Sequence, residues 1–363
     1  MTEELDTTTQ TADYEAYEQT LREANDFILR KQLDEMYREE LRQKIEPYTL
    51  RADHQLPPLK PVVKRGEVLI CSEGNISAVV GEAKSKKTFL CTAIVGSMLE
   101  WGGSQQFGIE RRLCRVLWVD TEQSKEHIQK VLFRINLLTH VKITSSLPHI
   151  LMQTLREESP KDRLQLLRYA IEYQKPKLVV VDGVSDLLTN TNNLEESEAL
   201  VAELLTLSTI YSCHIMCVLH TNPNSDKARG HLGSTLMRKA ETVLFVHRVG
   251  DISIVEPQYC RNMPFERFAF CVDEVEDASS LGPQAVGLGL PVECDLPSVG
   301  SEQEDDCVRI LRNELGGSAE RKLLTTKVEQ VLGVTHGYAK VKVTRAIQRG
   351  MLKLCDADVV MLP

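Results

Sequence analysis

The residues from Gly81 to Thr88 have the types and spacing of a loop that binds phosphate. The loop follows the apolar run 76–80, precedes an apolar run that begins at Phe89, and reads Gly81-Glu82-Ala83-Lys84-Ser85-Lys86-Lys87-Thr88. In such a loop backbone N–H groups wrap phosphate, a lysine reaches the terminal phosphates, and a serine or threonine hydroxyl binds Mg²⁺. We therefore expect residues 81–89 to hold a nucleotide, with Lys87 on the phosphates and Thr88 on the metal.

One position departs from this pattern, because Lys86 stands where a second glycine is expected. Glycine there allows close approach to phosphate or a backbone conformation that side chains disfavour. A lysine can serve in its place if its φ is negative and its side chain points outward, where it adds positive charge near the nucleotide. The loop alone is therefore a weak signal, and the residues that accompany it carry the interpretation.

Two carboxylates follow strand-like runs at the places where such a loop needs them. Asp182 ends the hydrophobic run 177–182 and is the candidate that holds the hydration shell of Mg²⁺. Glu122 comes just after the run 115–120 and is the candidate general base that activates the attacking water. The structural alternatives are a plain strand-end turn at Asp182 and, for Glu122, a carboxylate stabilised by the dipole of a helix that starts near Ser124.

Further polar residues follow the run 214–219. His220 is a candidate sensor of the γ-phosphate, although a single histidine at a strand end is usually structural. Arg229, or Arg238 and Lys239 one helix later, are candidates for a cationic finger that reaches the nucleotide of a neighbouring subunit. The alternative for the segment 223–233 is a solvated basic loop or one that contacts the phosphates of nucleic acid.

The elements that must position these residues alternate between short β-rich runs and helical stretches from about Gly66 to Asp273, which predicts an α/β core with a mostly parallel sheet flanked by helices. Several runs are continuously aliphatic, as strands buried on both faces should be. The predicted strands are 76–80, 115–120, 150–155, 177–182, 214–219, 241–247, 253–258 and 268–272.

Regions of different composition flank this core. Residues 14–45 carry apolar residues at helical spacing and predict a helical arm, which packs on its own chain, lies on a neighbouring subunit or stays mobile; a proline-rich linker follows. Residues 276–306 have the composition of a linker. Two helices, a glycine, a third helix and a short hairpin then predict a winged-helix-like domain. The predicted domains are therefore 1–60, 61–275, 276–306 and 307–363.

The last domain is basic although the chain as a whole carries a formal net charge of −9. Between Arg321 and Lys353 there are eight Lys and Arg residues and one acid, Glu329. Contacts from Lys and Arg to phosphates dominate the non-specific affinity for nucleic acid. We expect Tyr338, Lys340, Lys342, Thr344 and Arg345 to lie on or near a recognition helix that contacts DNA, with a protein-binding winged helix as the alternative.

Composition places the chain among ordinary globular proteins. Hydrophobic residues make up 42% of its 363 residues, and no apolar run approaches the roughly 18 residues that a membrane span needs. The acidic, polar N-terminus lacks the features of a secretion signal. Ten scattered cysteines form no CxxC pair, which is typical of reduced thiols. We expect a cytoplasmic protein without a membrane partner.

The ordered set Gly81, Lys87-Thr88, Glu122, Asp182, His220 and 227–230 resembles RecA-like ATPases of the RepA hexameric-helicase and KaiC branch, and looks closest to AAA-annotated members carried by bacterial mobile elements. The resemblance covers roughly residues 66–272. It implies a RecA core, ATP with Mg²⁺, assembly of copies into a ring or filament, with a hexamer as one such ring, and action on DNA.

Three functional hypotheses follow from these patterns. The first is an oligomeric ATPase that hydrolyses ATP on DNA, as a helicase or replication factor of a mobile element. The second is a nucleotide-gated DNA-binding regulator with little turnover, which Lys86 in place of glycine favours. The third is a degenerate phosphate-loop fold that serves only as an assembly scaffold.

Overall fold

The computed structural model describes residues 7–99, 106–110, 114–222, 225, 227–275, 278–297, 306–332, 336–348, 350–355 and 358–362; for 7–14, 106, 278, 337, 338, 341, 345 and 348 it describes the backbone alone. The chain divides into two units, Met1–Pro58 and Leu59–Pro363. None of the helices in these described ranges has both the length and the apolar character that a membrane span requires.

The first unit is built on one long helix, α1 (Thr7–Ile45), followed by the short helix η1 (Glu46–Tyr48). Ion pairs one turn apart support α1, including Arg22 with Glu18 at 3.1 Å and Lys44 with Glu40 at 2.7 Å. Such exposed pairs stabilise a helix by only a few tenths of a kcal/mol each. The helix predicted for the N-terminal arm is confirmed and begins earlier than its apolar spacing indicated.

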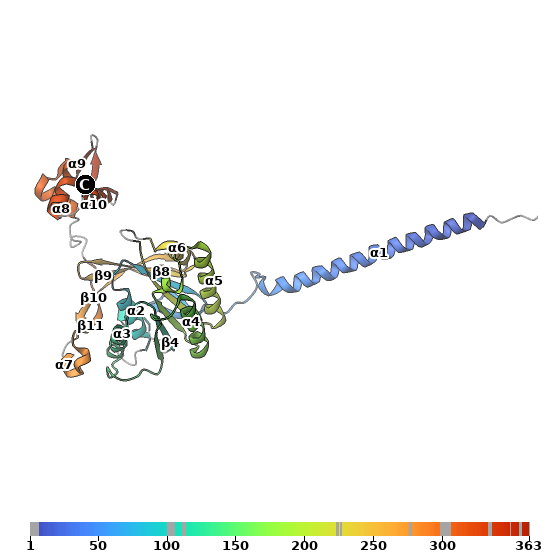
Figure 1. The fold of residues 1–363 in the computed structure, drawn as a ribbon, viewed down its shortest axis with the longest axis horizontal. Coiled ribbons are helices and arrows are strands. Elements are labelled where there is room, and N and C mark those ends of the chain that lie inside the picture. Colours follow the sequence, from blue (N-terminus) through green and yellow to red (C-terminus); the bar gives the residue numbers. More distant parts are fainter. Residues whose placement is uncertain are drawn as a thin grey trace, which may run out of the picture. The chain divides into compact units, whose positions relative to one another are not determined.

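The second unit is organised around a sheet of nine strands in the order β11-β10-β9-β8-β3-β7-β6-β4-β5 (Figure 1). The strands from β8 to β5 in this order run parallel, and β9, β10 and β11 continue the sheet in antiparallel fashion. The mostly parallel α/β sheet expected for a RecA-like core is therefore present. The strand bounds are β3 (Ile76–Gly81), β4 (Val116–Asp120), β5 (Ile150–Thr154), β6 (Leu178–Asp182), β7 (His214–His220), β8 (Thr242–Val249), β9 (Ile252–Cys260), β10 (Phe268–Glu274) and β11 (Gly289–Cys294).

Helices cover both faces of this sheet. Successive side chains of a strand point to opposite faces, so the apolar central strands present apolar side chains on both faces, and each face is covered by helices. Trp118 and Val180 pack with helices α2 (Lys87–Leu99) and α3 (Lys125–Leu138) in one core. Leu117 and Val179 pack on the other face with α4 (Pro160–Gln174), α5 (Leu194–Ile210) and α6 (Gly230–Lys239). Short helices η2 (Gln106–Gly108) and η3 (Val184–Leu187) connect these elements. The two cores explain why the central strands are aliphatic throughout.

Some elements lie where the composition predicted none. A hairpin of β1 (Pro61–Arg65) and β2 (Val68–Ser72) precedes the first predicted strand. Within residues 276–306, predicted as a linker, lie α7 (Ala278–Leu281), η4 (Pro283–Ala285) and strand β11, which pairs with β10 from Ala269↔Cys294 to Glu274↔Gly289. Pro291 fits β11 because this strand is at the edge of the sheet and one side needs no N–H donor.

The C-terminal residues form helices and a small antiparallel sheet around a core of their own, which includes Ile310, Leu324 and Val343. The elements are α8 (Asp306–Leu315), β12 (Ser318–Glu320), α9 (Arg321–Leu332), α10 (His336–Gln348), β13 (Lys353–Cys355) and β14 (Val359–Met361). The sheet order is β12-β14-β13. The side chains of Tyr338 and Arg345, expected on the recognition helix, lie outside the described residues.

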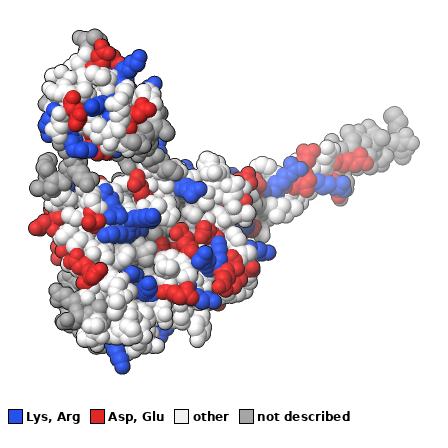
Figure 2. Space-filling model, turned by 60° about the vertical axis from the view of Figure 1, so that its left-hand side comes forward, with Lys and Arg blue, Asp and Glu red and all other residues white. Residues whose placement is uncertain are grey.

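Charges of both signs meet in this C-terminal part. Arg321 faces Asp358 at 3.8 Å, Lys327 pairs with Glu314 at 3.2 Å, and Lys342 pairs with Asp306 at 2.5 Å. In Figure 2 the upper lobe, which corresponds to the C-terminal helices of Figure 1, carries blue and red side chains next to each other. The excess of positive charge counted over 321–353 is therefore partly balanced by acids outside that window.

A buried polar network fastens the β1–β2 hairpin to the sheet. His214 directs Nδ1 to the Ser72 carbonyl at 2.8 Å and Nε2 to the Ser77 hydroxyl at 2.9 Å. The Glu241 carboxylate accepts hydrogen bonds from the Ser72 N–H and hydroxyl, both at 2.8 Å, and from Asn262 Nδ2 at 3.0 Å. Burial disfavours a charged imidazole and lowers the pKa of His214 from 6.5 to about 4. His214 is therefore neutral in the folded protein at neutral pH.

Acidification from about pH 6.5 to pH 4 should destabilise the protein through His214. The unfolded chain binds a proton at His214 near pH 6.5, whereas the folded protein does not until about pH 4. His214 is neutral in both states above pH 6.5, so the free energy of unfolding is unaffected there and falls as the pH drops from about 6.5 to about 4. We expect His214→Gln to lower the free energy of unfolding by about 2 kcal/mol at pH 7, since it leaves buried partners unsatisfied. Because glutamine does not titrate, the stability of this variant should fall less than that of the wild type between pH 6.5 and pH 4. Thermal unfolding of both proteins over this pH range is the measurement; equal acid sensitivity would contradict the assignment.

Candidate functional site

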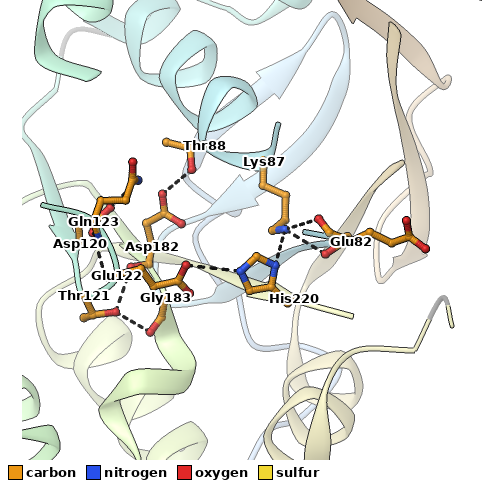
Figure 3. Close-up of polar contacts among 11 residues, drawn as sticks. Glu82, Lys87, Thr88, Asp120, Thr121, Glu122, Gln123, Asp182, Gly183 and His220 are labelled. Carbon is orange, nitrogen blue, oxygen red and sulfur yellow. Dashed lines mark hydrogen bonds and ion pairs between the residues drawn. The ribbon is translucent and has the colours of Figure 1, made fainter. Parts of the chain in front are cut away.

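The parallel register brings the predicted site residues to one edge of the sheet. Gly81 at the end of β3 pairs with His220 at the end of β7, and Asp120 at the end of β4 pairs with Asp182 at the end of β6. Since the carboxyl ends of neighbouring parallel strands meet at the same edge, the side chains that follow them converge there (Figure 3). The sequence-based grouping of residues on four different strands is thus reproduced in space.

Lys87 occupies the centre of this group and is buried, with 6% of its surface exposed. Its ammonium Nζ donates to the carbonyl oxygens of Gly81 and Glu82, both at 2.9 Å, and lies 3.0 Å from Nδ1 of His220. Burial lowers the pKa of Lys87, and the nearby carboxylates of Asp182 and Glu122 oppose that shift. The loop therefore holds its lysine by three polar contacts within the protein.

Thr88 and Asp182 form the pair that was expected at the metal. The Thr88 hydroxyl donates to Oδ2 of Asp182 at 2.7 Å. Burial, together with the charge of Asp120, raises the pKa of Asp182 to about 7. A buried carboxylate with a raised pKa favours a nearby cation, so the two oxygen donors suit Mg²⁺.

A histidine bridges the lysine and the candidate base. Nε2 of His220 lies 3.4 Å from Oε2 of Glu122, while Nδ1 faces the Lys87 ammonium. Because an ammonium can only donate, Nδ1 accepts and the Nε2–H donates to Glu122. This hydrogen bond is the main cause that lowers the pKa of Glu122, which is therefore ionised at neutral pH. Lys87, His220 and Glu122 form a continuous hydrogen-bonded line.

Asp120, which the sequence pattern marks only as the end of a strand, fixes the turn that carries Glu122. It is fully buried, and its Oδ1 accepts from the backbone N–H groups of Glu122 at 3.0 Å and Gln123 at 2.7 Å. Its Oδ2 accepts from Nε2 of Gln123 at 2.9 Å. The signal in the sequence was the carboxylate two residues before Glu122, since aspartate commonly caps the backbone that follows it.

Gly183 gives this turn the space it needs. It adopts φ 95°, and a Cβ at this position would lie 2.3 Å from the Thr121 hydroxyl oxygen and 2.7 Å from Cγ of Glu122. Thr121 in turn donates to the carbonyls of Asp182 at 3.2 Å and Gly183 at 2.8 Å. The strand end at Asp182 and the turn at Glu122 are thereby locked together.

A cleft of about 370 Å³ opens beside the loop. It is lined by Lys84, Lys86, Lys87, Thr88, Phe89, Glu122, Gln123, His127, Lys130, Arg134, Asp182, Val218, Leu219 and His220. The guanidinium of Arg134 lies 4.4 Å from the centre of the Phe89 ring and donates through Nε to the Gly289 carbonyl at 3.0 Å. Burial lowers the pKa of Arg134. Its role had no local signal, because α3, α2 and β11 meet only in the folded chain.

The backbone of the phosphate loop has a positive φ at Lys86, where a lysine was expected to fit only with a negative φ. Lys86 has φ 69° and Lys84 has φ 65°, both in the left-handed region. Lys86 therefore does not meet the condition of a negative φ, and it adopts the conformation for which glycine is usually chosen. Its side chain leaves the loop and donates from Nζ to the Asp251 carbonyl at 3.1 Å.

Arg229 and Lys239 are not brought into this cleft. Arg229 is the residue before α6, with its N–H donating to the His220 carbonyl at 3.0 Å, and its side chain is exposed. Lys239 ends α6, is exposed, and its carbonyl accepts from Arg261 Nη2 at 2.9 Å. Neither is among the residues that line the cleft in the described part of the chain. Of the segment 223–233, residues 223, 224 and 226 lie outside the described residues.

The donor set at this edge suits a nucleotide with its metal. Among the described residues, no group of three or more His, Cys, Asp or Glu side chains is placed to hold a metal ion alone. Mg²⁺ commonly takes one or two protein ligands and completes its shell with water and substrate phosphates. Thr88 and Asp182 are such ligands, and they lie next to a loop whose three lysines, 84, 86 and 87, line the same cleft.

The chain was compared with family models, with solved structures and with curated proteins. A family model described as an AAA domain (AAA_25) matches residues 39–226, just over half of the chain. Among solved structures, the crystal structure of the RadB recombinase is similar at 14% sequence identity and a TM-score of 0.41, over 55% of this chain and 87% of that one. The comparison with curated proteins found no match. By the family model, which spans the loop, Glu122 and Asp182, the chain belongs to the AAA domain family.

Proposed function

We propose that this protein is a Mg²⁺-dependent ATPase that works as an oligomer on DNA, similar to the RepA-like branch of RecA-like ATPases. The observation that carries the proposal is the convergence of Lys87, Thr88 with Asp182, and Glu122 with His220 at one edge of the sheet. Membership of the AAA domain family supports nucleotide binding and ATPase activity. Activity as a helicase, and a role in a mobile element, are further steps in the same proposal.

Each residue has a distinct task in this reaction. Lys87 moves from the carbonyls of Gly81 and Glu82 to the terminal phosphates, where a full positive charge offsets the charge that develops on the transferred group. Glu122, ionised and oriented by its turn, accepts a proton from the attacking water. Thr88 and Asp182 would hold Mg²⁺, which when bound would supply positive charge to offset that of the phosphate oxygens. His220 contacts both Lys87 and Glu122 and so registers the loss of the terminal phosphate.

Lys87→Ala should abolish ATP binding and turnover, because it removes the buried loop cation that would contact the phosphates. Glu122→Gln should retain binding but lower turnover by about 10²-fold or more, since it removes a general base without changing shape. Phosphate release with Mg²⁺ and calorimetric binding of ATP, measured on the same preparations, separate the two effects. The proposal fails if wild-type protein with DNA releases phosphate no faster than Lys87→Ala.

Gly183→Ala should lower turnover more than it weakens ATP binding. The added Cβ would collide with Thr121 and with Glu122, so the base moves while the phosphate loop stays in place. Gly66→Ala is the matched control, because Gly66 also has a positive φ, 55°, but has no atom within 4 Å of the added Cβ. We expect a loss of about tenfold in kcat for Gly183→Ala only; equal kcat values for the two variants would argue against a placement role for Gly183.

A nucleotide-gated regulator with little turnover is the second candidate. It is favoured by the contacts that hold Lys87 on Gly81, Glu82 and His220, because nucleotide binding must break them before catalysis. Calorimetric binding of ATP without measurable phosphate release, with or without DNA, would select the regulator. If calorimetry detected no nucleotide binding, both candidates would be excluded and the third hypothesis, a fold that serves only as an assembly scaffold, would stand.

DNA binding is proposed for the C-terminal domain, read as a winged helix, and for the segment 223–233. Over residues 306–363 there are ten Lys and Arg residues against six Asp and Glu, a net charge of +4. The side chains of Lys322 and Lys340 are exposed and make no ion pair with the residues that the structure describes. They are therefore the better candidates for phosphate contacts than Lys327, which already pairs with Glu314. Arg229 and Lys239 remain candidates for a finger that acts on a neighbouring copy.

Replacing Lys322 and Lys340 by alanine together should weaken binding to duplex DNA uniformly across sequences and reduce the slope of log affinity against log salt by about two. Lys327→Ala is the control, because its ammonium is engaged by a carboxylate and its loss should change the slope little. Fluorescence anisotropy at several salt concentrations provides both slopes. If the double variant keeps the wild-type slope, the C-terminal domain is not the DNA contact.

A further inference from the structure

Lys86 links the phosphate loop to a turn of the sheet that is distant in sequence. Its Nζ donates to the carbonyl of Asp251 at 3.1 Å, across the turn between β8 and β9. A second bond follows the same path, because the buried hydroxyl of Ser253 donates to the carbonyl of Ser85 at 3.2 Å. Two neighbouring loop residues are therefore fastened to the same hairpin.

The receiving turn is itself held in a fixed shape. Arg248 donates through Nη2 to the Gly250 carbonyl at 2.9 Å and lies 3.2 Å from Oδ1 of Asp251. Gly250 adopts φ 61°, as a tight turn requires. The charged groups of this turn close to Lys86 are Arg248 and Asp251, with Asp273 from β10 also near. The Asp251 carbonyl is thus presented at a defined place beside the loop.

The conformation of Lys86 runs against its own preference. A lysine at φ 69° is strained by contact between its Cβ and the backbone, and glycine at the same position is not. A glycine, however, has no side chain that can reach Asp251. Strain of this kind persists where the surrounding structure enforces it, and it commonly coincides with a functional requirement.

We propose that Lys86 is a positioning residue that holds the phosphate loop against the β8–β9 turn, in the shape that receives a nucleotide. The loop then keeps this shape before the phosphates arrive, and binding loses less conformational entropy. Nucleotide occupancy is also transmitted to β8 and β9 through the same contact. This inference rests on the proposed function, since it concerns the ATP site.

Three variants separate the strain of Lys86 from its contact. Lys86→Gly removes both the strain and the contact with Asp251. Lys86→Met keeps a side chain on the left-handed backbone but has no hydrogen-bond donor, whereas Lys86→Arg keeps a donor. Ser253→Ala removes the second bond to the loop. Lys161→Met is the control for the loss of one positive charge, since Lys161 is exposed on α4 and does not line the cleft. Calorimetric binding of Mg·ATP, steady-state kinetics and thermal unfolding without nucleotide are measured on each.

For Lys86→Gly, thermal stability and ATP binding are expected to change in opposite directions. Lys86→Gly should raise Tm by about 2 °C through relief of strain and yet weaken ATP binding about fivefold through loss of the hydrogen bond. Lys86→Met should weaken binding equally and raise KM, with kcat within twofold and no gain in Tm. Ser253→Ala should weaken binding in the same direction, whereas Lys86→Arg and Lys161→Met should bind as wild type does.

Two outcomes overturn this inference while leaving the proposed function in place, and they are distinguishable from each other. If wild-type protein binds ATP and Lys86→Met binds it equally well, the contact with Asp251 does not position the loop. If Lys86→Gly binds ATP more tightly than wild type, the lysine obstructs the site. Failure of the wild-type protein itself to bind ATP would overturn the proposed function, and this inference with it.

Discussion

The register of the parallel strands is the constraint on which the site depends. Gly81 is paired with His220, and Asp120 with Asp182, through hydrogen bonds of the sheet backbone. A slip of one residue would turn each of these side chains to the opposite face. The register is in turn fixed by two hydrophobic cores, one on each face of the sheet, because every residue of β4 and β6 is buried.

Much of the fold was predictable because the signals are local. The apolar runs that became β4, β6 and β7 end in polar residues, and the run that became β3 ends at Gly81, so both the strands and the candidate residues could be identified in order. The same logic placed Glu122, Asp182 and His220 near Lys87, and their contacts agree with that grouping. The order of the strands in the sheet was not predicted, since nothing in a single run says which strand is its neighbour.

Other features depend on contacts between distant segments, which a sequence pattern does not show. The conformation of Lys86 is set by Asp251 and by the buried Ser253 bond, and neither carries a motif. Arg134 is placed over Phe89 by the meeting of α2 and α3. Strand β11 was hidden by glycine and proline in a segment whose composition is that of a linker. In the C-terminal domain, acids outside the basic stretch, such as Glu314 and Asp358, offset the charge that the window suggested.

The edge strand β11 also sets where the core can be divided from the rest of the chain. A protein cut after Val275, where the composition changes, would lose β11 and with it the Gly289 carbonyl that accepts from Arg134. The half-buried guanidinium beside Phe89 would then lack this acceptor, at a cost of about 1–3 kcal/mol. The edge of β10 would also be exposed to pairing with other chains. An isolated core that retains residues through Cys294 avoids both losses and keeps the wall of the cleft intact.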